Sequence, residues 1–190
     1  MNDACDASIP ELRTARLLLR GFTVADAGAL RRLEGDRAVA ETTLNIPHPY
    51  EEGVGEAWIG THAKDFAEDR AAVFAVTPVA GDELVGAVGL TINREHRHAE
   101  LGYWIGHPYW GRGYATEATA ELLRFGFTTL GLHRIFAHYF ATNSASGRVM
   151  QKLGMQQEGM LREHALKWEK FVDLICCGIL EPSWRREQGG

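Results

Sequence analysis

The sequence predicts one α/β (α+β) domain with a mixed, mostly antiparallel central sheet and helices on both of its faces. Its 190 residues are 45% hydrophobic and 24% charged, which suits a single globular core. Strand-like and helix-like hydrophobic patterns follow one another in the order β-α-α-β-β-β-α-β-α-β-β. A long apolar helix pattern at 114–130 joins two strands, so these two must run parallel, whereas short turns join antiparallel neighbours.

Caps, prolines and hydrophobic spacing indicate the elements of the first half. The run Leu17-Leu-Leu19 between arginines is typical of a strand, and Thr23 or Asp26 can cap a helix after it. Pro47 and Pro49 interrupt any period and indicate a loop. The predicted segments are, in order, a flexible polar start at 1–10, a strand at 12–22, a helix ending near 33, a loop at 35–50 with room for one helical turn, and an amphipathic helix at 51–69.

The second half is richer in valine, isoleucine and large apolar residues. A turn at Ala80-Gly-Asp82 between two Val-rich runs favours a hairpin, and the helix pattern at 114–130 is apolar on most sides, so it must pack deeply. The predicted segments are strands at 71–78, 83–93 and 98–105, a helix at 114–130, a strand at 134–142, a helix at 144–153, and two strands within 156–182. We expect one domain over 11–184 and a polar tail at 185–190.

Composition excludes several classes of protein. The net charge is −5 and the pI is about 5.9, whereas a protein that binds nucleic acid non-specifically is basic. An acidic protein is better suited to a cationic substrate than to nucleic acid. No uncharged run reaches the ~18 apolar residues of a membrane span. The start carries Asp3 and Asp6, unlike a basic secretory leader. We therefore expect a cytoplasmic protein that binds neither nucleic acid nor membrane.

The cysteines and histidines do not predict a metal site. Cys5, Cys176 and Cys177 are an odd number without Cys-x-x-Cys spacing. Neighbouring residues of a strand point to opposite faces, so Cys176 and Cys177 are poor disulfide partners, and one of them is expected to be a small core residue. His96 and His98 have no nearby Cys or helical His spacing, so we expect no metal.

A glycine-rich loop precedes the helix at 114–130. Gly111 and Gly113 can adopt backbone angles closed to other residues, which lets successive N–H groups converge on one anion. A helix starting near Tyr114 adds its unpaired N–H groups and the positive end of its dipole, so the expected guest is a phosphate or pyrophosphate. The loop lacks both the P-loop lysine and the three-glycine dinucleotide pattern, which disfavours nucleoside triphosphates and NAD.

Two motifs resemble those of the GNAT superfamily of N-acetyltransferases. Trp110-Gly-Arg-Gly-Tyr-Ala115 resembles the family loop Gln/Arg-x-x-Gly-x-Gly/Ala, with Trp110 departing at the first position. Asn143, Ser146 and Gly154 fit the spacing of the family's second motif. Residues 158–163 and 173–179 are similar to the last strands of the Rim-type branch, which acetylates the N-termini of ribosomal proteins. The resemblance covers roughly 12–184.

The resemblance implies acetyl-CoA as co-substrate, bound where the two parallel strands splay apart. Backbone groups of Trp104, Ile105 and Gly106 would then pair with the pantetheine amides, and Asn143 would hydrogen-bond CoA. The residues expected to hold the pyrophosphate are Trp110, Gly111, Arg112, Gly113, Tyr114, Ala115 and Thr116.

Acetylation of an amine also needs groups that move protons. Glu100 is the first candidate for the general base, because it shares a strand face with Gly102 and Trp104 near the expected thioester. Two alternatives stay open: Glu100 is a structural partner of an arginine such as Arg134, or the amine loses its proton to water. The family resemblance suggests Ser146 as the proton donor to the leaving thiolate, the alternative being that it caps helix 144–153.

The implied activity is transfer of acetyl from acetyl-CoA to a primary amine by direct attack in a ternary complex. The acceptor is expected to be a protein N-terminus such as that of a ribosomal protein; a polyamine, amino acid or antibiotic is the alternative. A non-catalytic acyl-CoA-binding module is a further alternative, favoured because Met150 stands where many relatives carry a tyrosine.

The segments 36–52 and 164–170 should select the acceptor, with Trp58, Tyr50, His48 and Trp168 as candidate wall residues. Monomer and homodimer are both compatible.

Overall fold

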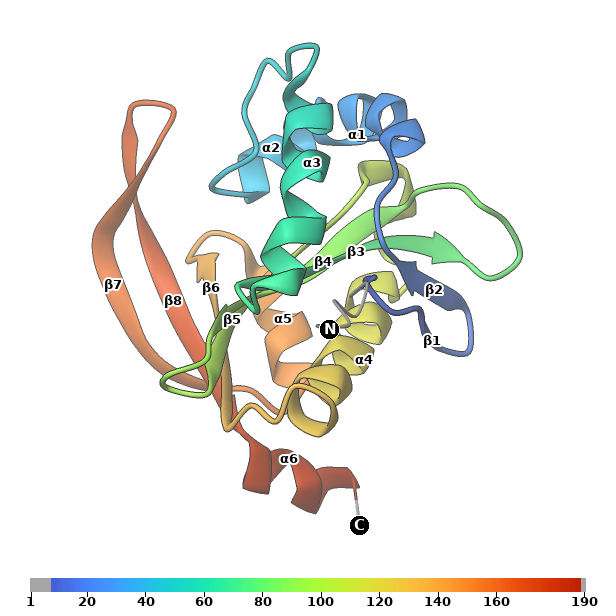
Figure 1. Ribbon diagram of the computed structural model, residues 1–190. Helices are drawn as coiled ribbons and strands as arrows, with labels where there is room; N and C mark the ends of the chain where they lie inside the picture. Colours follow the sequence, from blue (N-terminus) through green and yellow to red (C-terminus); the bar gives the residue numbers. More distant parts are fainter. Residues whose placement is uncertain (1–7, 189–190) are drawn as a thin grey trace.

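The computed structural model describes residues 8–188, which fold around one twisted sheet (Figure 1). Residues 1–7, which include Cys5 and most of the stretch predicted to be flexible, lie outside the described residues. The strands, in chain order, are β1 (Leu12–Arg13), β2 (Leu17–Arg20), β3 (Ala71–Pro78), β4 (Gly86–Asn93), β5 (His98–Ile105), β6 (Arg134–Phe140), β7 (Gln156–Lys167) and β8 (Lys170–Leu180).

The sheet has the order β1-β2-β3-β4-β5-β6-β8-β7. Among the described strands, β5 and β6 pair in parallel, and every other neighbouring pair is antiparallel. This confirms the predicted mixed sheet and its parallel pair. The crossover between β5 and β6 is the apolar helix that the sequence indicated, α4 (Tyr114–Thr128).

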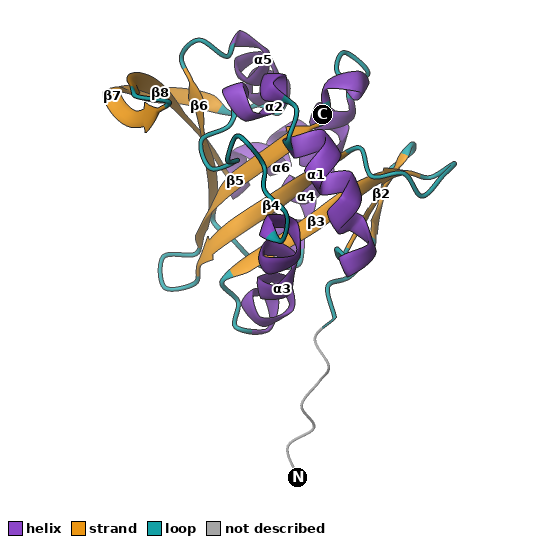
Figure 2. Ribbon diagram, turned by 90° about the horizontal axis from the view of Figure 1, so that it is seen from above, coloured by secondary structure: helices purple, strands orange, loops and turns teal. Residues whose placement is uncertain are grey.

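Helices cover both faces of the sheet, as predicted (Figure 2). Alternation along β3 divides the core: Phe74 and Val76 face a large cluster with Leu122 of α4 and Met150, whereas Ala75 faces a second cluster with Leu30 and Ile59. The remaining helices are α1 (Ala27–Glu34), α2 (Arg37–Thr42), α3 (Val54–Ala67), α5 (Ser144–Lys152) and α6 (Glu181–Gln188), with 3-10 turns at Val24–Asp26 and His107–Tyr109.

The structure differs from the sequence prediction at both ends of the chain. The single strand predicted at 12–22 is broken into β1 and β2, because the Thr14 hydroxyl oxygen accepts a hydrogen bond from the Leu17 N–H at 2.8 Å and closes a turn. Helix α6 was not predicted; its sequence is polar, and it is anchored by Trp184, whose ring lies 5.3 Å from that of Phe127. Residues 185–188 of the predicted tail are therefore helical.

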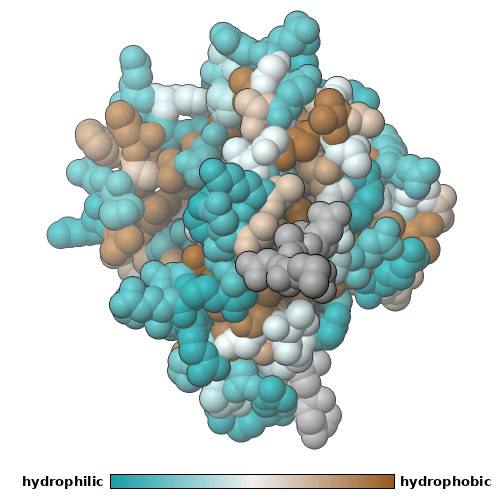
Figure 3. Space-filling model, viewed as in Figure 1, coloured by the Kyte–Doolittle hydropathy of each residue, from teal (hydrophilic) through white to brown (hydrophobic). Residues whose placement is uncertain are grey.

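The hairpin of β7 and β8 forms one edge of the sheet and rises beside α2 (Figure 1). Its outer half carries exposed large apolar side chains, which belong to Met160, Leu161, Leu166, Trp168 and Phe171. Brown patches are visible on the left of Figure 3, on the side where this hairpin lies. An open strand edge of this kind can pair with another chain.

Two further expectations concern membranes and cysteines. Between residues 8 and 188 no helix combines the length and apolar character that crossing a membrane requires. Cys177 is buried in the core and Cys176 is half-buried, and both are free thiols, as expected of neighbours that point to opposite faces.

Candidate active site

The parallel strands β5 and β6 separate in the middle of the sheet. Their pairing ends at the rung Glu100↔Phe136, although β5 continues to Ile105 and β6 to Phe140. Beyond this rung the facing edges of β5 and β6 are not paired with each other, and we call this region the strand gap. Exposed strand edges inside a sheet are rare, so the strand gap is the first candidate for a ligand site.

Alternation along β5 decides which backbone groups face the strand gap. The Gly106 N–H donates to the Val85 carbonyl at 2.9 Å, and its carbonyl accepts from the Tyr109 N–H. Successive residues direct their backbone groups to opposite sides, so Trp104 bonds toward β4, and Leu101, Tyr103 and Ile105 face the gap. At Trp104 and Gly106, where ligand contacts were predicted, the backbone groups are thus directed to partners within the protein, and the groups that face the gap belong to the odd-numbered positions.

Trp110 has a structural task that the family motif does not describe. Its indole Nε1 donates a hydrogen bond of 2.6 Å to the Ile105 carbonyl, which ties the glycine loop to the end of β5. This bond also occupies the carbonyl that a pantetheine amide would otherwise meet, so at Ile105 the N–H remains for a ligand.

The glycine loop has the geometry of an anion cradle. Gly111 has φ +75° and Gly113 has φ +80°, both in the left-handed region that favours glycine. Glu117 is the first residue of α4 whose N–H reaches an intrahelical acceptor, the Gly113 carbonyl at 3.0 Å. The N–H groups of the first turn, at Tyr114, Ala115 and Thr116, are thus left for a ligand at the positive end of the helix dipole.

The turn before β2 fastens this loop from the outside. Arg16 Nε donates to Glu117 Oε2 at 2.7 Å, and Arg16 Nη1 donates to the Arg112 carbonyl at 3.1 Å. The Thr14 hydroxyl donates to Glu117 Oε1 at 2.6 Å. The Arg112 side chain instead turns back to the Pro108 carbonyl at 3.1 Å. The cradle is therefore held by α4, β5 and the 14–16 turn together.

On the α4 and α5 side of the strand gap, Ser146 and Tyr103 form a hydroxyl pair. The two oxygens are 2.6 Å apart, and either one can be the donor. The cap of α5 is Asn143, whose Oδ1 accepts from the Ser146 N–H at 3.1 Å, so the capping alternative for Ser146 is wrong. Burial raises the pKa of the Tyr103 phenol, so Tyr103 keeps its proton and can donate a hydrogen bond.

Glu100 lies on the opposite side of the sheet and pairs with a histidine. Its Oε1 is 2.8 Å from His138 Nδ1, while Arg134 forms its ion pair with Glu158. The alternative in which Arg134 holds Glu100 is therefore wrong. The neighbouring position on the same face is Gly102, where an added Cβ would meet no atom within 4 Å. A carboxylate–imidazole pair thus borders open space at the mouth of the strand gap.

The two segments predicted to select the acceptor meet above this face. The Lys167 Nζ donates to the carbonyls of Leu44 at 3.3 Å and Ile46 at 3.2 Å. The Trp168 ring lies 5.8 Å from that of His48 and 5.1 Å from the Arg37 guanidinium carbon. We call this contact the acceptor rim.

Tyr50 and Trp58, the other candidate wall residues, pack elsewhere. Trp58 lies 5.1 Å from Phe22, and Tyr50 is buried next to Glu34.

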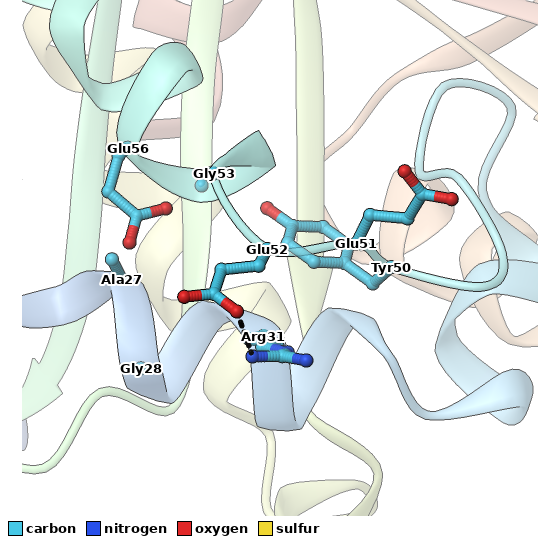
Figure 4. Close-up of a pocket in the computed structure, with 9 residues that line it drawn as sticks. Ala27, Gly28, Arg31, Tyr50, Glu51, Glu52, Gly53 and Glu56 are labelled. Carbon is cyan, nitrogen blue, oxygen red and sulfur yellow. Dashed lines mark ion pairs between the residues drawn. The ribbon is translucent and has the colours of Figure 1, made fainter.

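A separate cavity of about 110 Å³ lies between α1 and the start of α3 (Figure 4). Tyr50 and the carboxylates of Glu51, Glu52 and Glu56 line it, and Glu52 forms an ion pair of 3.6 Å with Arg31. Tyr50 is the one candidate wall residue among those that line it, and none of the residues predicted to bind acetyl-CoA or to move protons does. Burial raises the pKa of the adjacent Glu34 to about 7, although a hydrogen bond from Tyr50 opposes the shift.

The histidines at 96 and 98 lie next to each other. Their rings are 5.7 Å apart, and within the part of the chain that the structure describes no three His, Cys, Asp or Glu side chains converge to hold an ion.

Sequence reasoning missed Tyr103 and His138. Alternation along the predicted strand 98–105 places Tyr103 opposite to Glu100, toward the helices. The parallel pairing places His138 on the same face as Glu100, but only once the register Glu100↔Phe136 is known.

Comparison with known proteins gives one family and several relatives. The model of the acetyltransferase (GNAT) domain matches residues 16–156. An uncharacterized N-acetyltransferase from Bacillus subtilis, YoaA, is 34% identical over 91% of this chain and 98% of its own length. The ribosomal protein uS5-alanine N-acetyltransferase of Escherichia coli is 28% identical over 94% and 95%.

A solved structure adds a similar protein with bound ligands. The spermidine N-acetyltransferase of Vibrio cholerae, crystallised with CoA and spermine, is 25% identical, with a TM-score of 0.78 over 90% of this chain and 99% of that one.

Proposed function

This chain belongs to the GNAT acetyltransferase family and is an acetyl-CoA-dependent N-acetyltransferase, and we propose that its acceptor is the N-terminal amine of a protein such as a ribosomal protein. The similarity to the uS5-alanine acetyltransferase over nearly the full length of both chains supports this assignment. The acceptor rim supports it too: Arg37 and Lys167 place two cations around Trp168, which opposes the approach of a polyamine.

The reaction type is supported mainly by the way the candidate functional groups are divided between the two sides of the strand gap. The cradle of Gly111 and Gly113 and the hydroxyl pair lie on the side of α4 and α5, and the Glu100–His138 pair lies on the other. An acyl donor and an amine can therefore approach from opposite sides and react directly in a ternary complex. This arrangement needs no covalent enzyme intermediate.

In this proposal, the acyl donor is held largely by backbone groups. The N–H groups of residues 111–116 bind the pyrophosphate, and the gap-facing groups of Leu101, Tyr103 and Ile105 bind the pantetheine arm. Asn143 lies at the N-terminus of α5, where its amide nitrogen can donate to CoA while Oδ1 caps the helix. Acetyl-CoA supplies the acetyl thioester.

The chain's side chains then move the protons. An ammonium ion has no lone pair, so its proton must leave toward the Glu100–His138 pair before the nitrogen can attack. On the other side of the gap, the Ser146–Tyr103 pair supplies a hydrogen bond or a proton to the departing sulfur. Burial raises the pKa of the Tyr103 phenol, which suits the role of a hydrogen-bond donor to the sulfur.

A panel of amines tests the acceptor assignment. Free CoA thiol is measured with short peptides that begin with alanine or serine, with spermidine and spermine, and with free amino acids. The control is each peptide with an acetylated N-terminus. We expect the free peptides to give the highest kcat/KM and mass spectrometry to place the new acetyl group on the α-amine. A higher kcat/KM for spermine, as the Vibrio cholerae relative would suggest, contradicts the proposal.

A further inference from the structure

We infer that His138 is the catalytic base that takes the proton from the amine, and that Glu100 acts through it as a positioning residue. This inference rests on the proposed function, since it concerns the proton that the acceptor amine must lose. It replaces the simpler hypothesis in which the Glu100 carboxylate meets the amine itself.

The first argument is the direction of the hydrogen bond between the two side chains. An ionised carboxylate only accepts hydrogen bonds, so the 2.8 Å contact between Glu100 Oε1 and His138 Nδ1 places a proton on Nδ1. In the neutral imidazole the lone pair is then on Nε2. Within residues 8–188 His138 makes this one side-chain hydrogen bond. Nε2 is therefore available to a ligand.

The second argument is position relative to the strand gap. Glu100 belongs to the last rung at which β5 and β6 still pair, where neighbouring strands are only ~4.8 Å apart and leave no opening. His138 is two residues further along β6, so it is the first side chain on that face beyond the last paired rung. His138 is therefore nearer than Glu100 to the place where the strands admit a ligand.

The third argument is the space in front of the imidazole. On the facing strand the corresponding position is Gly102, which is exposed and has no atom within 4 Å of an added Cβ. The His138 side chain is 27% exposed and that of Glu100 is 47% exposed, so solvent reaches both members of the pair. The next residue on this face of β5 after Gly102 is Trp104, which is buried.

Other titratable groups surround the pair without replacing either member. Cys176 stands opposite His138 in the β6–β8 ladder, and burial together with the carboxylates of Glu158 and Glu100 raises the pKa of its thiol. Cys176 is thus a neutral thiol. Glu158 is held by Arg134. On β5, His98 lies behind Phe136, with the two ring centroids 5.5 Å apart.

The proton balance of the step is complete with these groups. The ammonium proton goes to His138 Nε2, and the neutral nitrogen then forms its bond to the acetyl carbon while the carbon–sulfur bond breaks. The nitrogen loses a second proton as the amide forms, and the sulfur gains one, so CoA leaves as the thiol. The imidazolium is stabilised by Glu100 until it releases its proton to water, so the net reaction frees one proton.

Chemical rescue tests the assignment. In His138→Ala we expect kcat to fall about 100-fold, the usual size for loss of a general base, while the KM for acetyl-CoA stays unchanged. The small side chain leaves a hole that opens to solvent, so free imidazole should restore turnover at least about tenfold. His98→Ala, a histidine on the same face behind the paired rung, is the matched control and should behave like the parent with and without imidazole.

Glu100 variants separate base from positioning residue. Glu100→Gln keeps an acceptor for the Nδ1 proton but loses the charge, so we expect about a tenfold loss of kcat. The double variant Glu100→Gln/His138→Ala should be no slower than His138→Ala alone, because residues that act as one unit are not additive. A loss in Glu100→Gln as large as in His138→Ala, without imidazole rescue of the latter, would show that Glu100 is the base. Parent-like turnover in folded His138→Ala also overturns the inference.

The same assays keep the two proposals distinguishable. All variants are measured with whichever amine the parent protein acetylates fastest, and their folding is checked by circular dichroism and thermal melting. A preference for a small amine overturns the protein N-terminus as acceptor and leaves the base assignment to be decided by the rescue. A parent-like His138→Ala overturns the base assignment and leaves the acceptor assignment intact.

Discussion

The two sides of the strand gap are built in opposite ways. On the side of α4 and α5, the polar side chains already have partners: Ser146 bonds Tyr103, Asn143 caps α5, and Trp110 holds Ile105. On the other side, one ion-pair-like contact between Glu100 and His138 borders open space at Gly102. The difference indicates that the first side is preorganised for one invariant ligand and the second is left open for a variable one.

The physical reason lies in what covers each side. Behind the first side stands the larger core cluster, in which Leu122 and Met150 of the two helices pack on the sheet. A ligand there meets fixed backbone groups, which cost little to order. The second side is covered by the acceptor rim, which consists of a loop and a hairpin tip joined by Lys167. Loops carry specificity because they change without disturbing a core.

Gly113→Val should disrupt CoA binding on the side of α4 and α5, and it should have the largest effect on activity of the variants considered. At φ +80° a branched side chain costs about 1–2 kcal/mol or forces the loop to another conformation, and its N–H groups would no longer converge. We expect CoA to bind about 100-fold more weakly by isothermal titration calorimetry.

The control for this variant is Gly131→Val. Gly131 has φ +65° but lies far along the chain from the loop, so the same backbone strain should lower the melting temperature and leave CoA affinity unchanged. Unchanged CoA affinity in a folded Gly113→Val protein would show that the glycine loop does not bind the pyrophosphate.

Gly102→Val should damage only the second side. Its backbone angles are accessible to any residue, since its φ is not positive, and valine favours strands, so stability should not fall. The new side chain would fill the space in front of His138. We expect kcat/KM for the amine to drop about 20-fold with CoA affinity unchanged.

Gly159→Val is the matched control for the acceptor side, because it also lies in a strand with open space around it, on β7. If Gly102→Val has the same kinetics as Gly159→Val, the acceptor does not bind in the open space at Gly102 beside Glu100.

Ser146→Ala and Asn143→Ala separate chemistry from capping on the first side. Ser146→Ala removes the partner of Tyr103 and should lower kcat and kcat/KM together by about tenfold, because a proton donor acts in the transition state. Asn143→Ala removes the cap and should cost about 1 kcal/mol of unfolding free energy. Thermal melting and steady-state kinetics measure both, and a slower Ser146→Ala protein with an unchanged melting temperature supports the donor role.

Glu34→Gln should leave activity unchanged and alter only the pH dependence of stability. The pKa of Glu34 is about 7 in the folded protein and ~4.3 in an unfolded chain. The folded state thus binds more protons between these values, and the free energy of unfolding falls as the pH rises through this window, by about 4 kcal/mol in total.

In Glu34→Gln this fall should disappear, so the variant is more stable than the parent above pH 7. Urea unfolding at pH 5 and pH 8 measures it, with Glu51→Gln at an exposed carboxylate as control. An equal pH dependence in variant and parent would show that Glu34 is not the buried acid.

The sequence by itself determined the order of elements, the parallel pair and the glycine loop. Each of these depends on local chemistry: the apolar period of 114–130, the crossover it forces, and two glycines that adopt positive φ. The same local reasoning placed Glu100 on one face of its strand with Gly102. It failed at 12–22, where one threonine side chain closes a turn that hydrophobicity does not reveal.

Only the tertiary structure decided the partners of the candidate site residues. Glu100 meets His138 rather than Arg134, and Ser146 meets Tyr103 rather than its own helix end. These pairs join β5 to β6 and β5 to α5 across 38 and 43 residues of chain. Such contacts depend on the register between strands and on how a helix settles on the sheet, and neither quantity is encoded in the spacing of one segment.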